Sequence, residues 1–318
     1  LGDVYKRQVH KYDMVDDLKE GGSFLLNCPW SGEELEEKLP AKMKRIIAQK
    51  KINFYTIDGI KIGKEIGLGG RINTILQSAF FTIANIIPKD DAIKYMKDAA
   101  TKSYSKKGQA IVDMNHAAIE RGATDFVKVE VPASWADAEG ELEKVVSTNG
   151  KPEVLEYVNT ILHPVNAYKG NQLPVSAFKN HIDGTVPQGT AAYEKRGIAV
   201  DVPSWNSENC IQCNFCSYVC PHAAIRPVAM TADEAAAAPA ATKKAPMMAM
   251  PGMTFTMTVS TLDCTGCGSC AQVCPGKKGN KALEMKPADG EMDQQEVFAY
   301  GLDLPVKPDV AAKFKETT

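Results

Sequence analysis

Residues 23–58 contain two apolar runs separated by a helical pattern, and together they predict one βαβ unit. SFLLNC at 23–28 and INFYTID at 52–58 are short apolar runs typical of buried strands. The segment between them, SGEELEEKLPAKMKRIIAQKK at 31–51, has helical periodicity and opens on a capping box, Ser31-x-x-Glu34. We therefore expect the first part of the chain to be an α/β domain whose parallel sheet is covered by helices.

Helical periodicity then continues beyond this unit. It predicts helices within residues 72–87, 88–104 and 107–122, with Gly122 as a stop signal, followed by a strand at 127–132 and one or two helices near 136–162. GLGGR at 67–71 follows a helical stretch and lacks the lysine of a phosphate-binding loop, so we interpret it as a helix stop.

From about His163 to Trp205 the pattern is lost, and Pro- and Gly-marked chain predicts an irregular connection between two domains. The cysteine-rich part that follows is interrupted by an Ala-, Pro- and Met-rich insertion at 231–252. We expect this insertion to be a solvated spacer, and the alternative is a methionine-bearing cover over one metal site.

Length, composition and charge limit the classes of function that we expect for the chain. A chain of 318 residues is long enough for two domains or more. Its 37 Lys and Arg against 39 Asp and Glu form no dominant basic stripe, so nucleic acid is not an expected partner. The longest apolar stretch, at 79–87, is far shorter than the roughly 20 residues that cross a bilayer, and no secretory signal is present, so no membrane association is expected.

Eight of the nine cysteines lie in two short copies of one pattern, CIQCNFCSYVC at 210–220 and CTGCGSCAQVC at 264–274. Each copy follows C-x2-C-x2-C-x3-C and precedes a proline, Pro221 or Pro275. This is the bacterial ferredoxin pattern, whereas structural zinc sites pair two distant C-x2-C knuckles. The spacing favours two [4Fe-4S] clusters and a reducing, cytoplasmic compartment, and a zinc-stabilised interaction module is the alternative.

In this pattern the last cysteine of each copy binds the cluster of the other copy. The first cluster is then predicted on Cys210, Cys213, Cys216 and Cys274, and the second on Cys264, Cys267, Cys270 and Cys220. Gly266, Gly268 and Ser269 allow the backbone to approach the cluster closely. The apolar residues expected to exclude water are Ile211, Phe215, Val219, Ile225 and Val273. Two clusters in one small fold are neighbours, which predicts electron transfer.

Other candidate residues receive a structural interpretation. His222 follows Cys220 and Pro221, but each cluster already has its four thiolates, so we expect a surface or packing histidine. Cys28 ends a predicted strand and is expected to be a small packing residue. We assign no catalytic residue in this chain.

Residues 12–30, 39–81 and 85–97 closely resemble the gamma-type domain of pyruvate:ferredoxin (flavodoxin) oxidoreductase, and 183–227 resembles its connecting segment and two-cluster ferredoxin-type domain. The resemblance implies an oxidoreductase that converts pyruvate and coenzyme A to acetyl-CoA and CO2, using thiamine diphosphate, Mg2+ and a third [4Fe-4S] cluster. It further implies a homodimer when full length, ferredoxin or flavodoxin as electron acceptor, and a gamma-type domain that contributes to coenzyme A binding.

The resemblance also predicts the domains. We expect a gamma-type α/β domain at 12–162, a connecting segment at 163–204, an α+β ferredoxin-like domain at 205–300, and a linker at 301–318. The G-D-G motif of a thiamine diphosphate site and the cysteines of a third cluster are missing from the sequence. We therefore expect a fragment that works with the remaining domains of the enzyme. The alternative is a free-standing electron carrier or a gamma-delta-like subunit of another 2-oxoacid oxidoreductase.

Overall fold

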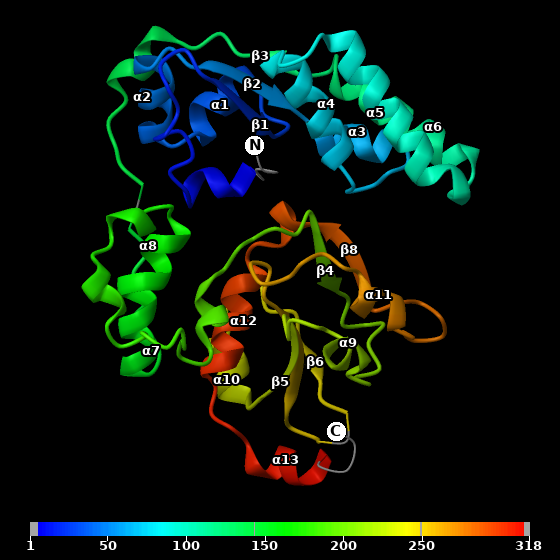
Figure 1. The fold of residues 1–318 in the computed structure, drawn as a ribbon. Helices are drawn as coiled ribbons and strands as arrows, with labels where there is room; N and C mark the ends of the chain where they lie inside the picture. Colours follow the sequence, from blue (N-terminus) through cyan, green and yellow to red (C-terminus); the bar gives the residue numbers. More distant parts are fainter. Residues whose placement is uncertain (1–5, 143, 249, 315–318) are drawn as a thin grey trace. The chain divides into compact units, whose positions relative to one another are not determined.

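The computed structural model describes residues 6–142, 144–248 and 250–314 and divides between Tyr193 and Glu194 into two units (Figure 1). In the first unit, β1 (Ser23–Asn27) and β2 (Asn53–Ile57) pair in parallel, with Ser23 opposite Asn53 and Asn27 opposite Ile57. A short third strand, β3 (Val127–Lys128), pairs antiparallel to β2, so the sheet is mixed. The predicted α/β class and the βαβ unit are confirmed.

Helices cover the sheet on both faces because successive strand residues point to opposite sides. Phe24 and Leu26 of β1 join Phe54 in a core under α1 and α2 that also contains Trp135. Leu25 instead faces a second core formed with α3, α4 and α6. Four consecutive buried residues in β1 therefore reflect a strand enclosed on both faces.

The single helix predicted at 31–51 is wrong in two details. The structure has two helices, α1 (Gly32–Lys38) and α2 (Ala41–Gln49), because Pro40 forces the preceding Leu39 into an extended conformation. Ser31 does cap α1 by position, but its side chain makes no capping hydrogen bond. The carboxylate of Glu34 instead accepts a hydrogen bond from Lys38 at 2.7 Å.

The next helices follow the predicted periodicity closely. They are α3 (Gly59–Glu65), α4 (Asn73–Ala84), α5 (Lys89–Tyr104) and α6 (Gln109–Gly122). A β-carbon at Gly122 would lie 2.3 Å from the carbonyl oxygen of Ile75, so this glycine lets α6 approach α4. The GLGGR segment ends α3, as expected, with Gly67 and Gly69 at φ values of +84° and +61°.

Shorter helical turns complete the first unit. They are the 3-10 helices Lys6–His10, Ser105–Lys107 and Ala133–Asp137, helix α7 (Pro152–Tyr157), a π-helical stretch Val158–Leu162, helix α8 (His163–Asn166), and the 3-10 helices Gly170–Gln172, Val175–Phe178 and Thr190–Tyr193. Helices predicted near 136–162 are thus present from 152 onward. Residues 163–193, expected as a connection, lie within the first unit.

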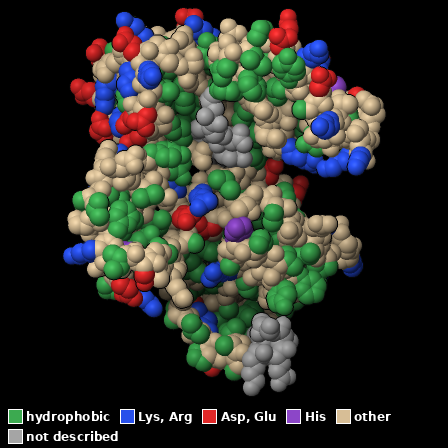
Figure 2. Space-filling view, viewed as in Figure 1, with side chains coloured by type: hydrophobic (Ala, Val, Ile, Leu, Met, Phe, Trp, Pro, Cys, Tyr) green, Lys and Arg blue, Asp and Glu red, His purple; other side chains and the backbone are tan. Residues whose placement is uncertain are grey.

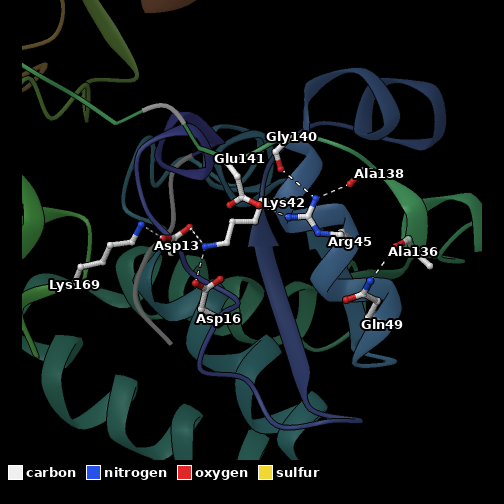
Figure 3. A network of polar contacts seen from close by, with 10 residues as sticks. All are labelled: Asp13, Asp16, Lys42, Arg45, Gln49, Ala136, Ala138, Gly140, Glu141 and Lys169. Carbon is white, nitrogen blue, oxygen red and sulfur yellow. Dashed lines mark hydrogen bonds and ion pairs between the residues drawn. The ribbon is translucent and has the colours of Figure 1, made fainter. Parts of the chain in front are cut away.

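Helix α2 ties three distant segments together through polar contacts. Figure 3 shows Lys42 of α2 between Asp13 and Asp16, with Lys169 approaching Asp13 from the other side. The Asp13 side chain is only 5% exposed, and its oxygens lie 2.7 Å from Lys42 Nζ and 2.9 Å from Lys169 Nζ. Burial opposes ionisation of this carboxyl, but the hydrogen bonds and charges of the two lysines outweigh it and lower the Asp13 pKa. Arg45 and other α2 side chains bind backbone carbonyls near residue 138.

The second unit is built from antiparallel pairs. β4 (Asp201–Trp205) pairs with β8 (Leu283–Pro287), and β5 (Ile225–Met230) pairs with β7 (Thr254–Val259), which also pairs with β6 (Ala245–Pro246). The helical elements are α9 (Phe215–Tyr218), α10 (Ala232–Ala237), α11 (Ser269–Val273), a 3-10 helix Ala288–Glu291, α12 (Gln294–Asp303) and α13 (Pro308–Phe314). A strand, a cysteine triplet, a short helix and a strand occur twice in order, which agrees with the predicted α+β ferredoxin-like class.

The insertion at 231–252 is more than the solvated spacer that composition predicts. Thr231 and Glu234 form a complete capping box at the start of α10, and β6 adds a strand to the edge of β7. Met247 packs, half-buried, against the core that contains Phe255. The described part of the insertion is therefore integrated into the second unit.

Surface properties agree with the composition. On the face shown in Figure 2, acidic and basic side chains are intermingled over α1 and α2, where Lys38 pairs with Glu34 and Lys44 with Glu36. Across residues 6–142, 144–248 and 250–314, no helix combines the length and the apolar character that a membrane span requires.

Candidate metal centres

Two cavities in the second unit are each lined by four cysteines. Cys220, Cys264, Cys267 and Cys270 line one cavity. Cys210, Cys213, Cys216 and Cys274 line another. We call these the second-cluster cavity and the first-cluster cavity. Each contains three cysteines from one copy of the motif and the last cysteine of the other copy, which is the grouping expected from the sequence.

Left-handed backbone turns orient each cysteine triplet. In the second copy Gly266 and Gly268 have φ values of +72° and +76°, and a β-carbon at Gly266 would lie 3.0 Å from the carbonyl oxygen of Asp201. In the first copy the same positions are held by Gln212 and Asn214, with φ values of +55° and +59°. Side chains are rarely found in this conformation, so their presence in the first copy requires an explanation.

The Gln212 side chain supplies a reason, because it anchors the hairpin of β6 and β7. Its Nε2 donates a hydrogen bond to the carbonyl of Pro246 at 2.8 Å, and its Oε1 accepts one from the backbone N–H of Met248 at 2.8 Å. Glycine at this position, as in the second copy, has no side chain to form these bonds. The hairpin is thus held against the loop that carries Cys210 and Cys213.

Backbone N–H groups point at the sulfurs in both copies. Four such hydrogen bonds have lengths of 3.3 or 3.4 Å; the pairs are Gln212 N to Cys210 Sγ, Ala224 N to Cys220 Sγ, Gly266 N to Cys264 Sγ, and Ala282 N to Cys274 Sγ. N–H donors stabilise the negative charge of a thiolate. The donors are matched between the copies, so they serve the two cavities equally.

The cysteine thiols differ in pKa, and burial is a main cause of the difference. Burial raises the pKa of Cys216 to about 12 and that of Cys270 to about 11. The pKa of Cys264 is also raised by burial, whereas a hydrogen bond with the Ser269 side chain lowers that of the exposed Cys267. The inner thiols therefore need a positively charged partner to ionise, which iron in a cluster supplies.

The cavities fit a cluster better than a single ion. Within the part of the chain that the structure describes, no three His, Cys, Asp or Glu side chains are close enough together to hold one metal ion. A zinc site requires four sulfurs about 2.3 Å from one ion. Four thiols spread around a cavity with apolar walls instead suit a cubane, whose corners are separate iron atoms.

The apolar residues that line the two cavities differ in part from those predicted. Of the five apolar residues expected around the clusters, Ile225 and Ile211 line a cavity, whereas Phe215 is 55% exposed. The first-cluster cavity is walled instead by Trp205, Met257 and Leu283, which the sequence analysis missed. The cysteine pattern carries no signal for these three positions, because they lie outside both cysteine runs.

The weaker candidates keep their structural interpretation. His222 is exposed at the rim of the second-cluster cavity. Cys28 is 4% exposed within the first core, where its backbone N–H donates to Ile57 at 2.9 Å. It is therefore a packing residue at the end of β1, as expected.

Comparisons with known families account for much of the chain. Residues 6–124 match the model described as pyruvate ferredoxin/flavodoxin oxidoreductase, and residues 209–278 match that of a 4Fe-4S dicluster domain. Residues 140–199 match a domain of unknown function.

Individual relatives extend the similarity across nearly the whole chain. A pyruvate:ferredoxin oxidoreductase of Moorella thermoacetica is 50% identical over 98% of this chain and 26% of its own length. A pyruvate-flavodoxin oxidoreductase of Enterobacter agglomerans is 45% identical over 96% of this chain and 25% of its own length. A pyruvate dehydrogenase [NADP(+)] of Cryptosporidium parvum is 41% identical over 98% of this chain and 17% of its own length. The chain thus spans about a quarter or less of these relatives.

Proposed function

We propose that the chain is the electron-relay portion of a pyruvate ferredoxin/flavodoxin oxidoreductase, which the matches to that family's model and to a 4Fe-4S dicluster domain support. The observation that carries the proposal is the pair of cavities, each with four cysteines drawn from both copies of the motif. We assign one [4Fe-4S] cluster to each. Cys210, Cys213, Cys216 and Cys274 hold the first, and Cys264, Cys267, Cys270 and Cys220 hold the second.

A bound [4Fe-4S] cluster supplies a site that gains and loses one electron at a time. The chain's own residues determine how the site behaves. Backbone N–H donors such as those of Ala224 and Ala282 stabilise the sulfurs, and apolar walls exclude water. Cys213 and Cys267 are the exposed ligands of the two sites and mark the edges nearest to solvent.

For the whole enzyme we propose the reaction of pyruvate and coenzyme A to acetyl-CoA, CO2 and a proton, with two electrons passed singly to ferredoxin or flavodoxin. The names of relatives at 50% and 45% identity support this acceptor. Thiamine diphosphate, Mg2+, a third cluster, the remaining domains and a homodimer belong to this proposal for the complete protein. We further propose that the first unit contributes to coenzyme A binding, and that the protein is cytoplasmic.

Anaerobic purification with iron and sulfide analysis tests the cluster assignment. Two cubanes predict about eight irons and eight sulfides per chain and a brown protein. Fewer than about six irons, or a colourless protein that contains zinc, would refute it. The Cys28→Ala variant is the matched control and should retain all of the iron, because this cysteine lies in the core of the first unit.

Paired replacements test the crossed ligation. Cys220→Ala combined with Cys264→Ala should remove one cluster and leave about four irons, since both residues serve the same cavity. Cys220→Ala combined with Cys210→Ala should remove both clusters. The reverse result, with more iron left in the second pair, would mean that each copy of the motif binds its own cluster.

A further inference from the structure

The indole of Trp205 has a buried N–H group without a partner. Trp205 ends β4 opposite Leu283 of β8, and only 4% of the residue is exposed. Its Nε1 is shielded from solvent and finds no acceptor among the described residues. Buried indole N–H groups nearly always donate a hydrogen bond, because an unsatisfied one costs about 1–3 kcal/mol. The missing acceptor is therefore a feature to be explained.

Trp205 borders a cavity in which an acceptor can lie. Trp205 lines the first-cluster cavity together with Cys210, Cys213, Cys216 and Cys274. It also borders an open polar groove that includes Lys243 and Lys281, but a solvent-shielded Nε1 is not hydrated from that side. The other unpartnered buried atom at this cavity is Asn214 Oδ1, which accepts and cannot donate.

The second-cluster cavity has no equivalent donor at this position. Trp205 precedes Cys210 by the same five residues by which Val259 precedes Cys264, and Val259 lines the second-cluster cavity. Valine offers an apolar wall and no hydrogen bond. The backbone donors are matched between the two cavities, so the indole is a difference between them.

We propose that Trp205 donates a hydrogen bond from Nε1 to a sulfur of the cluster held by Cys210, Cys213, Cys216 and Cys274, and so raises the reduction potential of that cluster above the value it would have without this bond. The inference rests on the proposed function, because it requires that cluster. Donors to the sulfurs stabilise the more negative, reduced state, and the potentials of such clusters depend on these bonds. Trp205 therefore acts on the cluster through a hydrogen bond and is not one of its ligands.

Isotope labelling tests the contact directly. The chain has three tryptophans, so 15N in the indole introduces three labels, of which Trp30 and Trp135 lie in the first unit. In the reduced, iron-loaded protein, pulsed electron paramagnetic resonance should detect a 15N coupling to a cluster. Trp205→Phe should abolish this coupling, and Trp30→Phe, the control, should leave it unchanged.

Redox titration supplies the second readout. In Trp205→Phe the midpoint potential of one cluster should shift to a more negative value while that of the other stays unchanged. Absence of any 15N coupling in the iron-loaded native chain would overturn the inference even if the variant does not fold. Coupling that persists in Trp205→Phe would overturn it as well. Failure of the native chain to hold about eight irons would instead refute the proposed function.

Discussion

Replacing Asp13 by Asn should destabilise the first unit by about 2 kcal/mol at neutral pH. The Asp13 carboxylate is nearly buried and lies 2.7 Å and 2.9 Å from the Nζ atoms of Lys42 and Lys169. Charges about 4 Å apart attract by about 4 kcal/mol at an effective dielectric of 20, and desolvation offsets much of this. Breaking a fully buried pair costs about 3–5 kcal/mol. We expect less here, because Lys42 retains Asp16 and Lys169 is 45% exposed.

The effect should depend on pH in a defined direction. The pKa of Asp13 is lowered from its ordinary value of 3.8, so its stabilisation is complete above that value and is lost as the pH falls through the folded-state pKa. The difference between native and Asp13→Asn proteins should therefore shrink as the pH falls below 3.8.

Urea unfolding followed by tryptophan fluorescence measures this difference. A Trp205→Phe background confines the signal to Trp30 and Trp135 of the first unit. The control is Glu34→Gln, which removes an exposed pair with Lys38 and should cost less than about 0.5 kcal/mol. A loss at neutral pH no larger than that of the control, or a loss unchanged in acid, would refute the reasoning.

Further predictions concern packing, the hairpin and the thiols. Gly122→Ala should destabilise the first unit by about 1–3 kcal/mol, because the new methyl meets a backbone oxygen of α4, whereas Gly70→Ala, in open space, should be near neutral in thermal unfolding. Gln212→Gly should speed hydrogen exchange at its partner amide in the β6 hairpin about tenfold or more; unchanged exchange would argue against an anchor. In the iron-free chain, iodoacetamide should modify Cys267 well before Cys216 near neutral pH, as mass spectrometry would detect, because only a thiolate reacts.

The sequence predicts the framework of the fold where one physical signal dominates. The apolar runs at 23–28 and 52–58 predict β1 and β2 because a strand enclosed on both faces has no polar alternation. The division of the predicted helix at Pro40 could also be predicted from the sequence, because proline restricts the backbone conformation of the residue before it. The absence of a capping hydrogen bond from the Ser31 side chain was not predictable from the sequence, because Glu34 has a competing partner in Lys38.

The cysteine grouping rests on a different signal, because cluster geometry restricts the spacing of its ligands, and the two cavities group the cysteines in the same way. The surroundings of the cysteines were not predictable from the sequence, because burial depends on contacts across the fold. Phe215 is apolar and adjacent to Cys216, yet it is exposed. Trp205 lies outside the motif, at the end of β4, and lines the cavity together with Leu283, its partner in β8.

The crossed ligation that we propose has a consequence for the synthesis of the protein. A ribosome that has translated as far as residue 250 has released Cys210, Cys213, Cys216 and Cys220, which are three ligands for one cavity and a single ligand for the other. Under our assignment the second site is complete only once Cys270 has emerged, and the first only once Cys274 has. Iron delivery must then wait for the second copy of the motif, and a chain interrupted before Cys270 has no complete cluster site.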